Sequence, residues 1–127
     1  MTEDKELKEI SQASFNWIKN NLEFYQMGES TIEGETPLID AFGQKIYCFI
    51  EKIADGYRIS DDSWLMYKLD PNQEDEEFYE SAVDITVGSG FDFDEETNEI
   101  FQEVEQVDLP EMINNLAQLQ VAISFLR

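Results

Sequence analysis

Carboxylates are the only abundant side chains in this sequence that carry reactive chemistry, and they are densest in one short stretch. Residues 91–106, "FDFDEETNEIFQEVEQ", hold seven acidic side chains and no basic one. Such a stretch fits three purposes: a loop that binds a metal ion, an imitation of a nucleic-acid backbone, or the solvated face of a β-hairpin. The spacing of the acids and the elements around them distinguish these purposes.

A calcium-binding loop places oxygen ligands at fixed positions and needs glycine at its sixth residue for a sharp turn. Thr97 occupies the glycine position here, and the flanking residues alternate like strands rather than helices. We therefore expect cations to condense loosely on an acidic surface, and no metal ligand is predicted. The residues that fall on the ligand positions are Asp92, Asp94, Glu96, Asn98 and Glu103.

A second group of carboxylates resembles a nuclease arrangement in which acids hold magnesium and a lysine polarises the attacking water. Neighbouring residues of a strand point to opposite faces, so Glu51 and Lys52 do not fit one site. We expect the aspartates of this group to cap turns and helix starts, as Asp often does. A divalent-metal-dependent enzyme is kept as an alternative, and its residues would be Asp40, Asp61 and Asp62.

Several kinds of site are excluded by residue types that the sequence lacks. The chain contains no histidine, which excludes Ser-His and Cys-His nucleophiles and histidine-ligated metals. Cys48 lies between Ile46 and Ile50 on one face of a predicted strand, so we expect it to be a small buried hydrophobe. Residues 88–90 are read as a helix stop rather than a phosphate-binding loop. We predict no catalytic residue and no cofactor.

The charge of the chain is large and unevenly distributed. Its 127 residues include 29 acidic and 8 basic side chains, for a formal net charge of −21. No basic residue falls within residues 69–126, so this half has no internal cation to offset its field. Such a field repels nucleic acid and anionic lipid and speeds encounter with basic partners. We therefore expect no direct binding to nucleic acid or membrane.

The composition predicts a single acidic domain, residues 1–127. Hydrophobic residues make up 42 % of the chain and aromatic residues 13 %, enough apolar surface to offset the entropy lost on folding. The N-terminus lacks the basic and apolar regions of a signal peptide, and no apolar run approaches the roughly 20 residues that span a bilayer. A lone cysteine fits a reducing compartment. We predict a cytoplasmic protein.

The first half of the chain predicts one helix followed by strands. Apolar residues at three- and four-residue spacing indicate a helix over about residues 3–21. Residues 30–40 alternate weakly and contain Pro37, which favours a strand that ends there or lies at an edge of the sheet. Residues 45–60 form a predicted hairpin, and its first strand, apolar on both faces, is the expected centre of the sheet.

The second half predicts two more helices and a second hairpin. Residues 61–70 begin as a turn and continue as either a short helix or a strand. A helix with an acidic first turn then runs from Pro71 to Gly88, and residues 91–104 form a hairpin. Asp108 is the expected N-cap of a C-terminal helix. Together these elements predict an α+β fold, a mainly antiparallel sheet of two hairpins plus an edge strand, packed with N-terminal, middle and C-terminal helices.

Several segments resemble one family of small bacterial and phage proteins. "TPLID" at residues 36–40 and "GYRISDD" at residues 56–62 are the most specific, and "FNWIKNNLEF" and "DEETNEIFQEVE" match as well. The chain is similar over nearly its whole length to the domain of unknown function 1828. The resemblance implies a protein of a bacterial host cell or its phage and implies no activity.

We expect a non-catalytic acidic binding protein that docks on a basic nucleic-acid-handling protein, such as a nuclease or toxin, and blocks it. In a phage it would be a nucleic-acid mimic of the anti-restriction or anti-CRISPR type. The alternatives are an immunity protein or antitoxin, the metal-dependent enzyme above, and a structural phage component; the oligomeric state is left open. Tyr79 and Phe91 are the predicted aromatic anchors. The predicted partner-binding residues are Glu74, Asp75, Glu76, Glu77, Glu80, Asp84, Asp92, Asp94, Glu95, Glu96, Glu99, Glu103 and Glu105.

Overall fold

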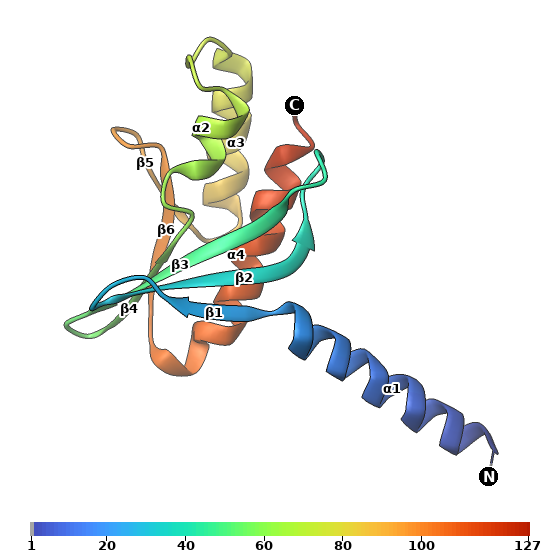
Figure 1. Cartoon of the computed structure of the whole chain (residues 1–127). Helices are drawn as coiled ribbons and strands as arrows, with labels where there is room; N and C mark the ends of the chain where they lie inside the picture. The colour runs from blue at the N-terminus through green and yellow to red at the C-terminus, as the bar shows by residue number, and fades with distance from the viewer. Residues whose placement is uncertain (1) are drawn as a thin grey trace.

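Strands and helices of the computed structural model, which describes residues 2–127, form one antiparallel sheet with helices packed on it (Figure 1). The strands lie in the order β1-β2-β3-β4-β6-β5, so only β4 and β6 are neighbours without being adjacent in the sequence. The predicted α+β class is confirmed. The elements are α1 (Thr2–Asn21), β1 (Glu23–Gln26), β2 (Thr31–Ile39), β3 (Lys45–Ile53), β4 (Gly56–Ser60), α2 (Trp64–Leu69), α3 (Glu76–Gly88), β5 (Asp92–Asp94), β6 (Glu99–Val104), a 3-10 turn η1 (Gln106–Asp108) and α4 (Leu109–Ser124).

Strand β3 lies inside the sheet, as predicted, because it has apolar or aromatic residues on both faces. Ile46, Cys48 and Ile50 are buried on the face toward the helices. The predicted hairpin of β3 and β4 is present, with Ile53 paired to Gly56 across a two-residue turn. Gly56 has a φ of 144°, and an added Cβ would lie 2.5 Å from the Val104 carbonyl oxygen. Only glycine therefore fits where β4 meets the end of β6.

The sequence predicts that the strand of residues 30–40 ends near Pro37 or lies at an edge of the sheet; β2 does end soon after Pro37, at Ile39, but a further strand, β1, lies outside its first part. β1 pairs with β2 only from Glu23 opposite Glu35 to Gln26 opposite Ile32. Pro37 lies beyond the end of this ladder, within a register shift of the β2–β3 pairing. The missing N–H of Pro37 therefore interrupts no strand pairing with β1. The local inference about proline holds, but the strand that carries it is not at the edge.

Helices α3 and α4 cover one face of the sheet and enclose the core. Leu116, Ile123 and Ile59 are fully buried there, and α4 packs against β2, β3 and β4 while α3 packs against β5. Figure 1 shows α4 running across the back of the sheet and α1 projecting away from it. Asp108 precedes α4, but its side chain accepts no capping hydrogen bond, so the predicted N-cap interaction is not made.

Residues 61–75 link the sheet to α3 through side chains that cap backbone N–H groups. The sequence leaves either a short helix or a strand open for residues 61–70. The structure has a short helix there, α2. The predicted middle helix begins later than Pro71, at Glu76. The Asp70 carboxylate accepts the backbone N–H groups of Glu74 and Asp75 and so holds the preceding turn, while Asp75 caps α3 by accepting the Phe78 N–H. None of the described helices is long and apolar enough to cross a membrane.

We predict that Cys48 reacts with thiol reagents only when the protein unfolds. Its side chain is fully buried, and burial, with a smaller contribution from Asp61, raises the pKa of the thiol to about 12. Almost no thiolate forms at pH 8, and the thiolate is the reactive species. Labelling with a chromogenic disulfide should be immediate in denaturant and should follow global unfolding without it. Rapid labelling of the native protein would contradict this placement.

Candidate functional site

One face of the sheet carries no helix among the described residues, and it gathers acidic and aromatic side chains from five of the six strands. Alternate residues of a strand point to the same face, and directly paired residues of neighbouring strands share that face. The pairs Tyr25 with Glu33, Glu35 with Tyr47, and Arg58 with Glu103 place these residues on the face away from the core. We call this surface the open sheet face. Its acids are Glu23, Glu33, Glu35, Glu51, Asp92, Asp94, Glu99 and Glu103, its aromatic residues Tyr25, Tyr47, Phe49 and Phe101, and its cations Lys45 and Arg58.

The two cations of the open sheet face are held by its own acids and neutralise only a small part of its charge. Lys45 Nζ lies 3.1 Å from Glu35 Oε1. The Arg58 guanidinium is paired with Glu99 and stacks 3.8 Å from the centre of the Phe101 ring. Eight carboxylates therefore face two cations that are already engaged. The surface remains strongly negative and presents aromatic rings between the charges.

The carboxylates also change the acidity of a tyrosine on this face. The Tyr25 hydroxyl donates a hydrogen bond to Glu23 and lies 3.3 Å from Glu35. The hydrogen bond to Glu23 is the main cause that raises the pKa of Tyr25 to about 12. With this raised pKa the phenol stays protonated to higher pH than an ordinary tyrosine and remains a hydrogen-bond donor beside the carboxylates.

A hollow of about 320 Å³ lies near the middle of the open sheet face. Its lining combines acids with one arginine, two hydroxyl residues and two apolar side chains. A basic side chain of a partner entering this hollow would meet carboxylates that belong to three separate segments of the chain. The lining residues are Met27, Thr31, Phe49, Glu51, Arg58, Ser60, Asp62 and Glu99.

The predicted partner-binding residues do not form one surface. Four of them, Asp92, Asp94, Glu99 and Glu103, lie on the open sheet face. Helix α3 packs on the opposite side of β5, where Tyr79 contacts Phe93 edge to face, so its acids face elsewhere. The residues away from the open sheet face are Glu76, Glu77, Glu80 and Asp84 on α3, Glu74 and Asp75 before it, Glu95 and Glu96 in the β5–β6 turn, and Glu105 after β6.

Three of the predicted residues are already engaged by other parts of the chain. Asp75 caps α3 and pairs with Arg127. The Asp94 carboxylate accepts the N–H groups of residues 96 and 97, which shapes the β5–β6 turn, and Glu99 pairs with Arg58. The two predicted aromatic anchors differ in their exposure to solvent. Phe91 is only 2 % exposed, so the prediction that it contacts a partner is wrong, while Tyr79 is half-buried.

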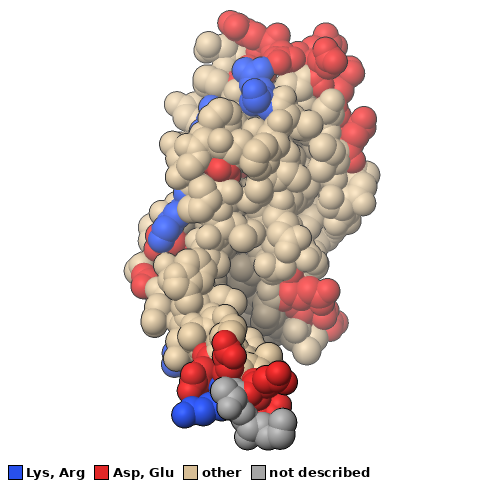
Figure 2. All heavy atoms as spheres, turned by 90° about the vertical axis from the view of Figure 1, so that its right-hand side faces the viewer, with Lys and Arg blue, Asp and Glu red and all other residues tan. Residues whose placement is uncertain are grey.

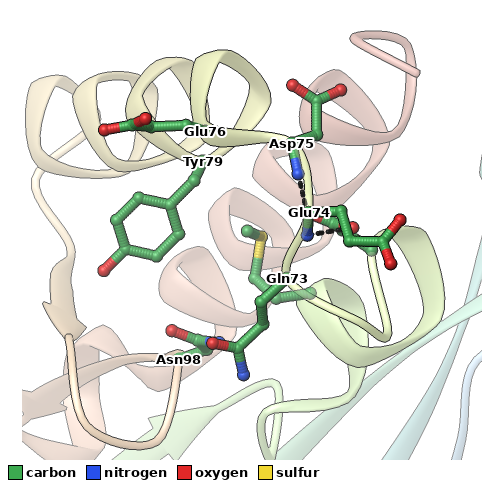
Figure 3. Close-up of a pocket in the computed structure, with 8 residues that line it drawn as sticks. Gln73, Glu74, Asp75, Glu76, Tyr79 and Asn98 are labelled. Carbon is green, nitrogen blue, oxygen red and sulfur yellow. Dashed lines mark hydrogen bonds between the residues drawn. The ribbon is translucent and has the colours of Figure 1, made fainter.

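A second hollow, of about 370 Å³, separates the start of α3 from the β5–β6 turn (Figure 3). Tyr79 extends into it from α3, and Gln73 and Asn98 face each other across its lower side. The carboxylates of Glu74 and Asp75 point away from the space. Because these acids diverge, the hollow does not present a converging set of carboxylates for a cation.

Sequence reasoning missed the acids of β1, β2 and β3, which form half of the carboxylates of the open sheet face. They are spaced singly along the sequence, so no charge run marks them. Alternation of residues along the strands identifies them. Glu33 and Glu35 are two residues apart in β2 and point to the same face, and Glu51 points outward from β3. Combining that alternation with the order of strands brings them beside the second hairpin. The acids missed are Glu23, Glu33, Glu35 and Glu51.

Asp40 and Asp61 act as structural residues. The Asp40 carboxylate is buried, accepts the N–H groups of Phe42 and Gln44, and lies 2.6 Å from Lys68 Nζ. Burial acts to raise the pKa of Asp40, but the hydrogen bond from Lys68 and the two N–H groups outweigh it and lower the pKa. The carboxylate therefore fixes the β2–β3 turn against α2.

Asp61 fixes the start of α2 to strand β6. Its carboxylate is 1 % exposed and accepts the N–H groups of Ser63, Leu65 and Ile100 at 3.0–3.2 Å. Asp62, next to it, is exposed and has a φ of 56°. The prediction that the aspartates cap turns and helix starts is confirmed for Asp40 and Asp61. Within residues 2–127, no three acidic or cysteine side chains gather closely enough to hold a metal ion.

Comparison with protein families identifies the domain. A family model described as domain of unknown function DUF1828 matches residues 36–123. The chain belongs to this family. The match includes both specific segments, residues 36–40 and 56–62, which contain Asp40, Gly56 and Asp61 of the turns described above. Helix α1 and strand β1 precede the matched residues. A search of curated proteins found no match, and neither did a search of solved structures.

Proposed function

We propose that this DUF1828 protein is a non-catalytic binding protein whose open sheet face docks on a basic surface of another protein. The observation that carries the proposal is the gathering of eight carboxylates and four aromatic side chains on a face that no helix within residues 2–127 covers. Carboxylates spread over five strands match many separate lysine and arginine side chains better than one metal ion. Aromatic residues between them provide the apolar contacts that dominate most interfaces.

The chemistry of such a partner is that of a protein that handles nucleic acid. Proteins of that kind carry lysine and arginine over a surface that neutralises phosphates, and an acidic surface competes for it. The inhibitor would then act as a nucleic-acid mimic, and in a phage it would block a host defence nuclease. The metal-dependent alternative has less support, because the carboxylates of Asp40 and Asp61 are already bonded to Lys68 and to backbone N–H groups.

The proposal predicts that charge reversal on the open sheet face abolishes partner binding. The test variant is Glu33→Lys, Glu51→Lys and Asp92→Lys, which alters β2, β3 and β5. The partner is first captured from nuclease-treated lysate, eluted with a salt gradient, and purified. Calorimetry should then show affinity weakened at least about tenfold by the triple variant and lowered by added salt.

A matched control changes the same charge on the other side of the sheet. Glu77→Lys, Glu80→Lys and Asp84→Lys on α3 alter the net charge equally, and binding should be retained. If the α3 variant loses binding and the open-face variant keeps it, the contact surface lies on α3. If both lose binding equally, only net charge matters, and the proposed face is wrong. Circular dichroism of both variants checks that the fold is intact.

A further inference from the structure

Helix α1 presents an apolar face that is exposed among the residues that the structure describes. Leu7, Phe15 and Trp17 are 66 %, 65 % and 57 % exposed, and Ile10 and Ile18 are exposed as well. Figure 1 shows the helix projecting from the body of the protein, and only its last turn approaches β2 and α4. Helices in proteins gain most of their stability by packing an apolar face against another surface. The face therefore needs a covering surface.

Most apolar residues of α1 lie on one side of the helix, and Phe15 lies outside that row. Leu7, Ile10, Ser14 and Trp17 recur at three- and four-residue spacing along one side of the helix, with Ile18 beside them. The opposite side carries polar residues of both charge signs. The residues opposite the apolar face are Lys5, Glu9, Gln12 and Asn16.

We propose that a second copy of this chain covers this face, and that the two α1 helices pack antiparallel about a two-fold axis. The apolar face of α1 offers on the order of 500 Å². A groove of about 500 Å³ continues it at the base of the helix, where Trp17 and Leu22 meet Pro37, Ile113 and Ala117. A stable dimer buries about 800 Å² on each partner, and the helix face supplies the larger part of that area, with the apolar lining of the groove added to it.

Charge favours a second copy through this surface over the alternatives. Helix α1 holds four acids and three lysines, so it is close to neutral in a chain of net charge −21. Two copies that meet here keep their acidic open sheet faces out of the contact. Figure 2 shows the side of the molecule that includes α1 and α4: its middle is largely uncharged, and acids gather toward its two ends. A lipid surface is a poor match, because membrane-bound helices are rich in lysine and arginine on the polar side.

The pattern of side-chain sizes favours the antiparallel orientation. When Leu7 lies opposite Trp17 of the second copy, Ile10 lies opposite Ser14, so a large residue faces a small one in the central layers. A parallel pair would stack Ser14 on Ser14 and Trp17 on Trp17, which leaves a void beside an overfilled layer. The antiparallel pair also aligns the two helix dipoles favourably.

Sedimentation equilibrium of the full chain tests the proposal. The wild type should give twice the 14.8 kDa mass of one chain at micromolar concentrations. Leu7→Glu with Ile10→Glu should weaken self-association at least about 100-fold, because each copy would place two charges in the apolar contact. Gln12→Glu with Asn16→Glu adds the same charge to the opposite side and should leave the dimer intact. Circular dichroism shows whether each variant folds.

A wild type that stays monomeric at about 100 μM would overturn the proposal, whether it binds neutral lipid vesicles or another protein instead. Loss of the dimer by both double variants alike would also overturn it. Orientation is tested by cross-linking. A mixture of the Ile10→Cys and Ser14→Cys variants should form a disulfide-linked dimer that neither forms alone, since the native Cys48 is fully buried. A disulfide in Ser14→Cys alone would overturn the antiparallel arrangement.

Discussion

Asp61→Ala is expected to destabilise the protein by about 3–5 kcal/mol. The substitution removes the acceptor of three backbone N–H groups, those of Ser63, Leu65 and Ile100, and each buried donor left without a partner costs about 1–3 kcal/mol. Urea unfolding monitored by tryptophan fluorescence measures the change. Asp62→Asn is the matched control, because Asp62 is exposed and asparagine tolerates its left-handed backbone; we expect a change within about 0.5 kcal/mol. Equal effects at both positions would contradict the role of Asp61.

The same carboxylate should give a pH-dependent contribution to stability. Burial is the main cause that raises the pKa of Asp61 to about 6, from an ordinary value of 3.8. Between these values the folded state binds a proton that the unfolded state does not, so stability decreases as pH rises through this window. The wild type should lose roughly 2–3 kcal/mol relative to Asp61→Asn between pH 4 and pH 7. Subtracting the stability of Asp61→Asn from that of the wild type cancels the contribution of the other acids. A stability difference that does not change with pH would contradict the raised pKa of Asp61.

The buried ion pair between Lys68 and Asp40 should produce an effect of similar size. Lys68→Met keeps most of the side-chain volume but leaves a fully buried carboxylate without its cation, at an expected cost of about 3–5 kcal/mol at pH 7. Adding Asp40→Asn to Lys68→Met should recover most of the loss, because no uncompensated charge remains. Urea unfolding of the four proteins of this double-mutant cycle measures the coupling.

Two further observations check the role of this ion pair. Lys52→Met, at an exposed lysine, should change stability by less than about 1 kcal/mol. The lowered pKa of Asp40 means that its contribution is complete above pH 4 and is lost as pH falls through the folded-state pKa. Lys68→Met should remove this loss at low pH. A double variant as unstable as Lys68→Met alone would show that the loss does not come from the unpaired charge.

The elements that could be predicted from the sequence are those with strong local signals. The spacing of apolar residues indicated α1 and α4, and the residues Ala54 to Gly56 indicated the β3–β4 turn. Strand β1 was missed because its four residues are all exposed, so it lacks the alternation of a half-buried strand. The pairing of β4 with β6 depends on contacts between residues distant in the sequence, which no local pattern records.

The candidate surface shows the same limit. The run of acids in residues 91–106 indicates a binding surface, and four of those acids lie on the open sheet face. The run also included residues that turn away, because a hairpin directs alternate residues to opposite faces. The acids of β2 and β3 could be assigned to this face only once the register placed Glu33 opposite Phe49 and Glu51 opposite Arg58.

The order of strands has a consequence for how the chain folds. Strands β1 to β4 form a meander of consecutive antiparallel pairs, each closed by a short turn. Roughly 40 residues separate β4 from β6 in the sequence. The chain must lose the entropy of closing this loop before the two strands can make any stabilising contact. Asp61 and Ile100 exchange hydrogen bonds at that junction. We expect the meander to form early and the docking of β6 to limit the folding rate. If the contacts of Asp61 form in the transition state, substitutions at Asp61 slow folding more than they speed unfolding.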